Sequence, residues 1–406
     1  MLILLRCYPK ITDWIYLFFN QSAAADYRFL PIYSYGFFVA VGFLSAATLA
    51  TLEMKRREKL GLMPGFEKEV TVGEAPRHVD LALTFLIGFV VFFKLFGIIV
   101  FQPELSTNAI PFIEFMKSPT LGSWAGGILG GLALAGFSYY QQHKARLPKP
   151  EKKKIKEYTS DNIGDLVVMA AIFGVLGASF FNYLENPESY DNFSKDPIGT
   201  FFSGLSVYGG LICAGAAFAI YARYKKIPVL QLFDAVAPAF ILANGIGRLG
   251  CQVSGDGDWG LTNLAAKPGW MPQFMWANNY AHNIIDEGVQ IAGCAEEHCM
   301  QLANPAYPTP IYEFLMCSAI FLILWSLRKK LTYKPGMVFT VFMILIGIQR
   351  FAIEQWRALS DRDLYHVFGM SLKQSELISI VLFLLGIAGT LYLYNYYKKN
   401  PGTAKQ

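Results

Sequence analysis

Charged residues are scarce in this sequence. Asp, Glu, Lys and Arg make up 16 % of its 406 residues and hydrophobic residues make up 54 %, whereas soluble domains carry about 25 % charged residues. This composition excludes an ordinary soluble domain. The net charge of +5 comes from lysines and arginines in short loops, as membrane topology requires, so it gives no support to nucleic-acid binding.

Cysteine is also scarce. The chain has six cysteines, and only Cys294 and Cys299 lie close together. His298 beside them could join a metal site, but a structural zinc takes four ligands. A disulfide in an oxidising compartment is therefore the preferred interpretation, and the sequence predicts no metal and no cofactor.

The N-terminus lacks the uninterrupted apolar core of a signal peptide, because charged residues break its first 20 positions. We expect residues 1–30 to form an arm that lies in the outer membrane interface, with its aromatic side chains at the level of the headgroups.

Long apolar runs dominate the rest of the chain. A helix needs about 17–25 apolar residues to cross a bilayer, and lipid leaves no partner for an open backbone, so spanning runs should be helices. The sequence therefore predicts an all-α polytopic membrane protein with one transmembrane domain over residues 31–400. Nine runs qualify: 32–52, 81–101, 122–140, 165–184, 205–222, 229–249, 311–327, 337–353 and 376–396.

Basic residues are distributed unevenly between the loops. The loops after odd-numbered spans, with the C-terminal tail, carry 23 of the 35 Lys and Arg residues, and the N-terminal arm and other loops carry 9. Cytoplasmic loops are the ones enriched in Lys and Arg. We therefore expect the N-terminus outside, the C-terminus in the cytoplasm, and residues 251–310 as a small external head region.

Two stretches of the chain resemble each other. Residues 80–148 and 165–228 match at an offset of 83–85 residues, and Ser-Trp-Ala-Gly-Gly-Ile from Ser123 corresponds to Ser-Val-Tyr-Gly-Gly-Leu from Ser206. Both copies cross the membrane in the same direction, which indicates a tandem duplication, unlike the inverted repeats of many transporters. We interpret the hairpin 80–148 as an inserted duplicate.

Lys94 is the unusual residue of the first copy, since Ser179 stands at the equivalent position of the second. A lysine within a span is a functional candidate. Alternatively, its long side chain reaches toward the membrane surface.

The stretch 244–260 carries the strongest functional signal. An apolar run from Pro228 ends near Arg248, and a glycine-rich turn with Asp256 and Asp258 follows. An arginine at that depth is costly unless it meets an anion or a wet cavity, and glycines let a backbone approach a ligand closely. The alternative is that the glycines pack helices together while Arg248 reaches for the interface.

A second basic cluster ends the span 337–353. Arg350, Glu354 and Arg357 are spaced i, i+4 and i+7, which predicts one helix face. The alternative interpretation of this spacing is an ion pair within the helix at the membrane interface. With Glu313 at the start of another apolar helix, the two arginine clusters predict a cationic pocket facing the outer leaflet. Arginine recognises phosphate through two parallel hydrogen bonds, so a phospholipid headgroup is the expected ligand.

Four segments resemble, in order, the motifs of bacterial prolipoprotein diacylglyceryl transferases. They are Tyr-Gly-Gly-Leu at 208–211, Gly-Arg-Leu-Gly with Ser-Gly-Asp and Trp-Gly within 247–260, Tyr-Pro-Thr-Pro-Ile-Tyr-Glu at 307–313, and Arg-Phe-Ala-Ile-Glu at 350–354. The resemblance covers the first span and about 165–396. The family usually has seven spans, and an inserted hairpin would raise that number to nine.

The resemblance implies a reaction and its partners. The enzyme would take the diacylglyceryl group of phosphatidylglycerol and join it as a thioether to the lipobox cysteine of a prolipoprotein signal peptide, releasing glycerol phosphate. The implied location is the bacterial cytoplasmic (inner) membrane, where the enzyme would contact membrane lipid and no nucleic acid.

The resemblance also implies the site residues. Arg248, Arg350 and Tyr208 are the expected catalytic residues. The expected substrate-binding residues are Tyr35, Gly209, Gly210, Cys251, Ser254, Asp256, Asp258, Gly260, Tyr312, Glu313, Glu354 and Arg357.

The sequence departs from the family pattern at four positions. Tyr208 stands where the family usually has a histidine, and Cys251 where it has an asparagine. Asp256 falls where a glutamate is expected, with one residue added before Gly260, and Ile346 replaces a tyrosine. Tyr208 would then bind substrate or relay a proton.

Two other classes of function stay open at this level. A lipid transporter or flippase would also use intramembrane arginines, but paired broken helices are expected there. A non-catalytic phospholipid-binding relative is favoured by the unusual residues Tyr208 and Cys251.

Overall fold

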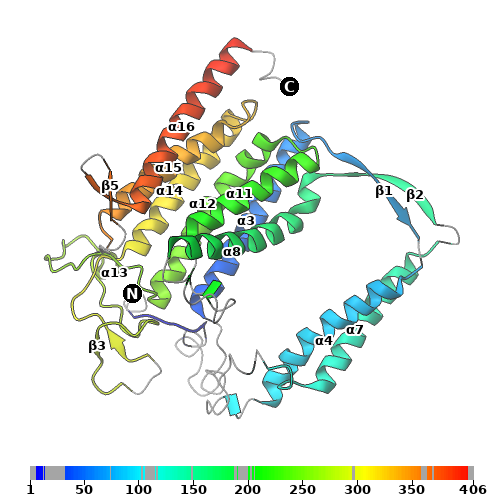
Figure 1. Ribbon diagram of the computed structural model, residues 1–406, viewed down its shortest axis with the longest axis horizontal. Coiled ribbons are helices and arrows are strands. Elements are labelled where there is room, and N and C mark those ends of the chain that lie inside the picture. The colour runs from blue at the N-terminus through cyan, green and yellow to red at the C-terminus, as the bar shows by residue number, and fades with distance from the viewer. Residues whose placement is uncertain are drawn as a thin grey trace. The chain divides into compact units, whose positions relative to one another are not determined.

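A computed structural model gives the arrangement of the chain (Figure 1). The structure describes residues 6–11, 13, 33–73, 75–101, 104–105, 115, 118–147, 150–186, 190, 200–201, 204, 206–294, 298–357, 364–367 and 370–400. Most of the predicted arm 1–30 lies outside the described residues, including the aromatic side chains that we expect at the headgroups.

Long helices make up most of the described chain. They are α3 (Ser34–Lys59), α4 (His78–Val100), α7 (Trp124–Lys144), α8 (Ile163–Glu185), α11 (Val207–Tyr224), α12 (Val229–Ser254), α14 (Thr309–Lys330), α15 (Met337–Glu354) and α16 (Gln374–Lys399). Two shorter helices are η2 (Thr159–Asn162) and α13 (Gln273–Trp276). The strands form three pairs: β1 (Phe66–Val72) with β2 (Glu151–Glu157), β3 (Val289–Gln290) with β4 (Met300–Gln301), and β5 (Leu364–Val367) with β6 (Met370–Lys373).

The helices bear out the predicted fold class. Each of the nine predicted spans coincides with one of the long helices. Within the described residues, eight helices are long and apolar enough to cross a membrane. The exception is α7, which is less apolar because it contains five glycines and ends in Gln-Gln-His-Lys. The chain is an all-α polytopic membrane protein, and the sides on which its termini lie stay a prediction.

The chain divides into two compact units. Unit 1 holds Met1–Cys7, Tyr35–Phe66 and Glu157–Gln406, and unit 2 holds Tyr8–Ser34 and Glu67–Lys156. Unit 2 therefore contains the α4–α7 hairpin, which the sequence sets apart as an inserted duplicate.

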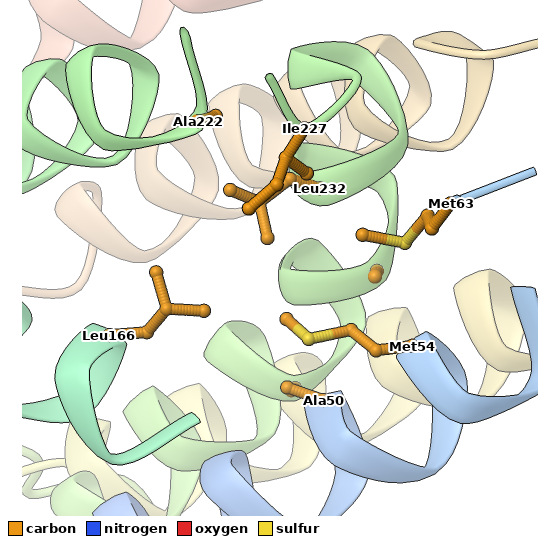
Figure 2. Close-up of a cluster of buried hydrophobic side chains, with 9 residues drawn as sticks. Ala50, Met54, Met63, Leu166, Ala222, Ile227 and Leu232 are labelled. Carbon is orange, nitrogen blue, oxygen red and sulfur yellow. The ribbon is translucent and has the colours of Figure 1, made fainter. Parts of the chain in front are cut away.

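Helix α12 is the central helix of unit 1, because it contributes to two buried clusters. One cluster joins it to α3, α8 and α11 through residues such as Met54, Leu166 and Leu232 (Figure 2). The other joins it to α14 and α15 through Ile241, Leu324 and further apolar side chains. The first half of α12 is thus packed on both sides.

The N-terminal end of α12 is tied to its neighbours by buried charge. Arg57 on α3 is fully buried, its Nε donates to Glu53 at 2.9 Å, and its NH1 lies 3.6 Å from Asp234 on α12. Asp234 also accepts the backbone N–H groups of Gly336 and Phe339 at 2.9 and 2.8 Å, which satisfies the first turn of α15. Such buried charges are tolerated only when they are paired and hydrogen-bonded, so these contacts fix the register of α3, α12 and α15.

The hairpins α4–α7 and α8–α11 share their packing geometry. In unit 2 the backbone N–H of Ser123 donates to Phe93 O at 2.9 Å, and in unit 1 the N–H of Ser206 donates to Ala178 O at 2.9 Å. These pairs are equivalent at the sequence offset of the two copies. The recurrence supports the interpretation of the hairpins as duplicates.

Lys94 is hydrogen-bonded to backbone carbonyl groups within unit 2. Its Nζ donates to the carbonyl oxygens of Phe115, Ser118 and Leu121 at 2.6, 2.6 and 2.7 Å. Three charge-assisted hydrogen bonds satisfy the ammonium group. Lys94 therefore secures the connection between α4 and α7. In the other copy, the buried hydroxyl of Ser179 has no hydrogen-bond partner among the described residues.

The head region between α12 and α14 has a small core of its own. Trp259 packs against the buried ring of Tyr280 at a centroid distance of 4.9 Å, and the Tyr280 hydroxyl donates to Gln252 Oε1 at 2.8 Å. The predicted disulfide between Cys294 and Cys299 is present. The head region lies at the end of the bundle where α12 and α15 finish and where α3, α11, α14 and α16 begin.

Candidate functional site

The site is built around Arg248 at the C-terminal end of α12. Helix α12 continues to Ser254, beyond the predicted span end at 249, so Cys251 and Ser254 lie within the helix. Gly250 allows this part of α12 to pack closely on α3, because a Cβ there would come within 3.2 Å of the Tyr35 backbone. Close helix contact thus holds Arg248 in place.

Glu313 on α14 connects the two predicted catalytic arginines. Arg248 Nε lies 2.6 Å from Glu313 Oε2, and Arg350 NH1 on α15 lies 3.5 Å from Oε1. The Glu313 side chain is only 2 % exposed. Glu313 Oε2 is close to the Arg248 guanidinium group, but the two atoms are not aligned for a hydrogen bond. Electrostatic attraction therefore dominates this pair. Removing one partner of such a buried pair is strongly destabilising.

Asp258 connects Arg248 to a third arginine. One carboxylate oxygen of Asp258 pairs with Arg248 NH1 and the other pairs with Arg357 NH2. Arg357 does not share the helix face of Arg350 and Glu354, because α15 ends at Glu354. The expected i+7 relationship is therefore wrong, whereas the i+4 pair of Arg350 and Glu354 is present at 3.4 Å.

Gly260 explains how Arg357 reaches Asp258. Its N–H donates to Tyr307 O at 2.9 Å, and the next N–H, of Leu261, donates to Trp356 O at 2.7 Å. A Cβ at Gly260 would lie 2.5 Å from Trp356 O. Gly260 thus serves a close approach between protein segments, which brings the end of α15 against the turn after α12.

Lys373 completes the network, although no sequence motif predicted it. Its Nζ lies 3.4 Å from Glu354 Oε1 and is buried at the start of α16. Its only local signal is that it precedes an apolar helix. Within the described residues the charges alternate along one connected path: Arg357, Asp258, Arg248, Glu313, Arg350, Glu354 and Lys373. Four cations alternate with three carboxylates, so one positive charge is left over.

Asp256 and Asp258 have opposite electrostatic environments in the turn after α12. Burial and then the negative charge of Asp258 raise the pKa of Asp256. Burial acts on Asp258 too, but the guanidinium groups of Arg248 and Arg357 outweigh it and hold the pKa of Asp258 below its usual value. Asp258 is therefore the firmly ionised carboxylate of the pair.

Cys251, Asp256 and Asp258 could bring three ligand atoms within 4.8 Å of one another. Arg248 NH1 faces both the Cys251 sulfur, at 3.9 Å, and Asp258. A metal ion would have to compete with this guanidinium group at close range, so we assign no metal to the cluster.

Two tyrosines face the arginines. The hydroxyl of Tyr208 on α11 is buried, has no hydrogen-bond partner among the described residues, and interacts electrostatically with Arg350. Tyr35 on α3 interacts electrostatically with Arg248. Both predicted positions therefore border the charged network, and the unpaired Tyr208 hydroxyl is available to a ligand.

Other predicted site residues make contacts within the protein. Cβ atoms at Gly209 and Gly210 would meet α8, so these glycines allow α8 and α11 to pack closely. The Ser254 hydroxyl donates to Gly250 O at 2.8 Å in its own helix, and the Tyr312 hydroxyl donates to Met275 O at 2.8 Å in the head region. Their expected roles in substrate binding stay proposals.

The assembled site can hold a phosphate at the membrane boundary. Arg248 at the end of α12 meets Arg350 and Arg357 at the end of α15 there, with surplus positive charge along the network. Guanidinium groups bind phosphate oxygens in pairs. Preorganised charge of this kind also stabilises negative charge that develops during a reaction.

Comparisons with known proteins identify the relatives of the chain. A family model described as prolipoprotein diacylglyceryl transferase matches residues 145–392. The match contains the whole charged network and begins just after α7 ends at Lys144. The α4–α7 hairpin thus lies outside the matched residues.

Curated relatives that the chain matches over most of their own length carry the same name. The phosphatidylglycerol–prolipoprotein diacylglyceryl transferase of Corynebacterium glutamicum is 27 % identical over 304 residues, which cover 72 % of this chain and 87 % of the relative. That of Staphylococcus aureus is 28 % identical over 297 residues, covering 72 % and 92 %. That of Pediococcus pentosaceus is 28 % identical over 292 residues, covering 71 % and 91 %.

Proposed function

Because the chain belongs to the prolipoprotein diacylglyceryl transferase family, we propose that its arginine network carries out the reaction of that family. The chain is a multi-pass membrane transferase of lipoprotein biosynthesis. It moves the diacylglyceryl group of phosphatidylglycerol to prolipoproteins. We further propose that the acceptor is the lipobox cysteine thiol of the signal peptide.

The bridge that Glu313 forms between Arg248 and Arg350 is the observation that carries this assignment. It holds two guanidinium groups from different helices before a ligand arrives. Preorganised donors need no rearrangement as charge develops, which is the main source of electrostatic catalysis. The phosphodiester of phosphatidylglycerol is the anion that we assign to them.

The reaction we propose is a displacement at the glyceryl carbon that bears the phosphate. The cysteine thiolate supplies the electron pair of the new C–S bond, and the C–O bond to phosphate breaks with its electron pair leaving on oxygen. The phosphate then carries two negative charges instead of one as glycerol phosphate departs. Arg248 and Arg350 stabilise the added charge, which the surplus positive charge of the network also favours.

The thiol gives up its proton to water at the membrane boundary before the displacement. A thiol with a pKa of about 8.5 ionises readily near positive charge, so the arginine network itself promotes the thiolate. Tyr208 lies near Arg350 with an unpaired hydroxyl. We assign it to bind the headgroup or to relay the proton.

We propose that the enzyme lies in the bacterial cytoplasmic (inner) membrane with its head region outside. The disulfide between Cys294 and Cys299 supports this orientation, because disulfides persist in oxidising compartments. The opposite helix ends are basic, with arginines and lysines in the last turns of α3 and α14, as cytoplasmic ends are.

Product mass provides the test. Purified protein is incubated with phosphatidylglycerol and a lipobox peptide, and the peptide should gain the mass of a diacylglyceryl group. A peptide with serine in place of the cysteine, and phosphatidylcholine in place of phosphatidylglycerol, are the controls. An unmodified peptide under conditions where the lipid binds would indicate a non-catalytic relative.

A further inference from the structure

Asp258 binds two arginines in the way that a phosphate group would bind them. Its two carboxylate oxygens contact guanidinium groups on separate segments, Arg248 on α12 and Arg357 beyond α15. A phosphate that used the same N–H groups would have to displace this carboxylate, since each N–H has one good direction of donation.

Asp258 differs from Glu313 in its freedom to move. The Glu313 side chain is 2 % exposed within the helix bundle, whereas that of Asp258 is 27 % exposed. Asp258 follows Gly257, whose φ of 95° marks a turn. Its backbone is held, because the Thr309 hydroxyl donates to Asp258 O at 2.6 Å. The side chain can therefore rotate away from the arginines while the turn stays in place.

Charge balance favours an exchange at this position. A phosphodiester carries one negative charge, as Asp258 does, so Arg248 and Arg357 contact the same charge after the exchange as before it. The second negative charge that forms as the C–O bond breaks then neutralises the surplus cation of the network.

We propose that Asp258 is an internal competitor for the phosphate site: it pairs with Arg248 and Arg357 in the lipid-free enzyme, yields them to the headgroup, and displaces the glycerol phosphate product when it returns. This inference rests on the proposed function. Asp258 lowers the affinity for substrate and product alike, and it shortens the time for which the dianionic product stays bound.

The Asp258→Asn variant tests the competition. Asparagine keeps the shape of the side chain and removes its charge, so phosphatidylglycerol should show a lower KM. A hydrogen bond to a charged group contributes enough to predict a change of about tenfold. Glycerol phosphate should bind the variant more tightly by a similar factor and inhibit it more strongly, with kcat unchanged or lower.

Asp286→Asn is the matched control. Asp286 lies in the same head region and pairs with His298 at 3.0 Å, and it forms no ion pair with the charged network among the described residues. Its KM and its affinity for glycerol phosphate should equal those of the wild type.

The opposite result identifies a structural role. If Asp258 merely orients the arginines, Asp258→Asn should raise KM and weaken glycerol phosphate binding, and this would overturn the proposal. If the Asn variant does not accumulate, KM and the affinity for glycerol phosphate are measured with Asp258→Ala, which removes the same charge. Failure of both variants to fold would equally assign Asp258 to the framework.

The binding arm separates this inference from the proposed reaction. Calorimetric titration with glycerol phosphate requires no turnover, so it tests the competition at Asp258 even if no thioether forms. Conversely, the wild-type enzyme could make the thioether while both variants bind glycerol phosphate no more tightly than the wild type. That result would support the proposed function and contradict the role of Asp258 as a competitor.

Discussion

Glu313 Oε2 and Arg248 Nε lie 2.6 Å apart, and the other Glu313 oxygen lies 3.5 Å from Arg350 NH1. One buried carboxylate from α14 therefore positions guanidinium groups from α12 and α15. The three helices share the buried cluster of Ile241 and Leu324 below this point, so core packing supports the geometry of the site. This coupling means that stability and activity should fall together when the bridge is broken.

Replacing the bridge carboxylate gives the first prediction. Glu313→Gln should lower the turnover rate by about a hundredfold, as the loss of preorganised stabilisation does elsewhere. It should also lower the unfolding temperature in detergent, because breaking a buried pair costs about 3–5 kcal/mol.

Glu185→Gln is the control for that variant. Glu185 lies at the same end of the bundle and accepts hydrogen bonds from Ser206 and Gln374. Its replacement should leave the turnover rate within a factor of a few. A Glu313→Gln enzyme with the wild-type rate and melting temperature would show that the bridge is dispensable.

Lysine replacements test the geometry of the two arginines. Arg248 contacts Glu313 through Nε and Asp258 through NH1, and a single ammonium group cannot reproduce this fork. We expect Arg248→Lys and Arg350→Lys each to lose about a hundredfold in kcat/KM, equivalent to about 2.7 kcal/mol. Arg223→Lys, in the exposed last turn of α11, should behave as wild type. Near-normal turnover in both site variants would reduce the arginines to interface residues.

Tyr208 is predicted to help rather than to initiate the reaction. Loss of one hydrogen bond to a charged group costs about 1.5–3 kcal/mol, so Tyr208→Phe should slow turnover by roughly ten- to a hundredfold. Tyr208→His should remain active and become faster as the pH rises through about 6.5, where imidazole loses its proton. The pH–rate curves of both variants and the wild type supply the measurement. A Phe variant as inactive as Arg350→Ala, with an inactive His variant, would make Tyr208 the indispensable acid–base group.

Membrane orientation is open to direct labelling. Trp270 in the head region and Tyr224 at the end of α11 are 79 % and 81 % exposed, so cysteines placed there are equally accessible once the membrane is opened. In intact cells an impermeant thiol reagent should label Trp270→Cys and leave Tyr224→Cys unlabelled until lysis. The reverse pattern would turn the site toward the cytoplasm.

Local sequence signals predicted the helices and the arginines well. Runs of spanning length located each long helix of the described residues, and all of them but α7 are apolar enough to cross a membrane. Arg248 and Arg350 stood out because charge is rare in such runs. The i+4 spacing of Arg350 and Glu354 predicted their contact, because this contact depends only on helix geometry.

Tertiary contacts could not be read from those signals. Asp258 meets Arg357, 99 residues away, because Gly260 lets Trp356 approach the turn after α12. Lys373 joins Glu354 through the placement of α16. In the five residues by which α12 extends past its predicted end, Gly250 packs closely on α3. Each of these features is decided by neighbours distant in sequence.

A single-turnover experiment tests the central claim, that the arginine network breaks the lipid's C–O bond as the thioether forms. Headgroup-labelled phosphatidylglycerol and a lipobox peptide are mixed with excess enzyme, and labelled glycerol phosphate and lipidated peptide are counted together. We predict one glycerol phosphate per thioether in the wild type and neither product in Arg350→Ala. Glycerol phosphate released without thioether, or both products at the wild-type rate in Arg350→Ala, would contradict the account.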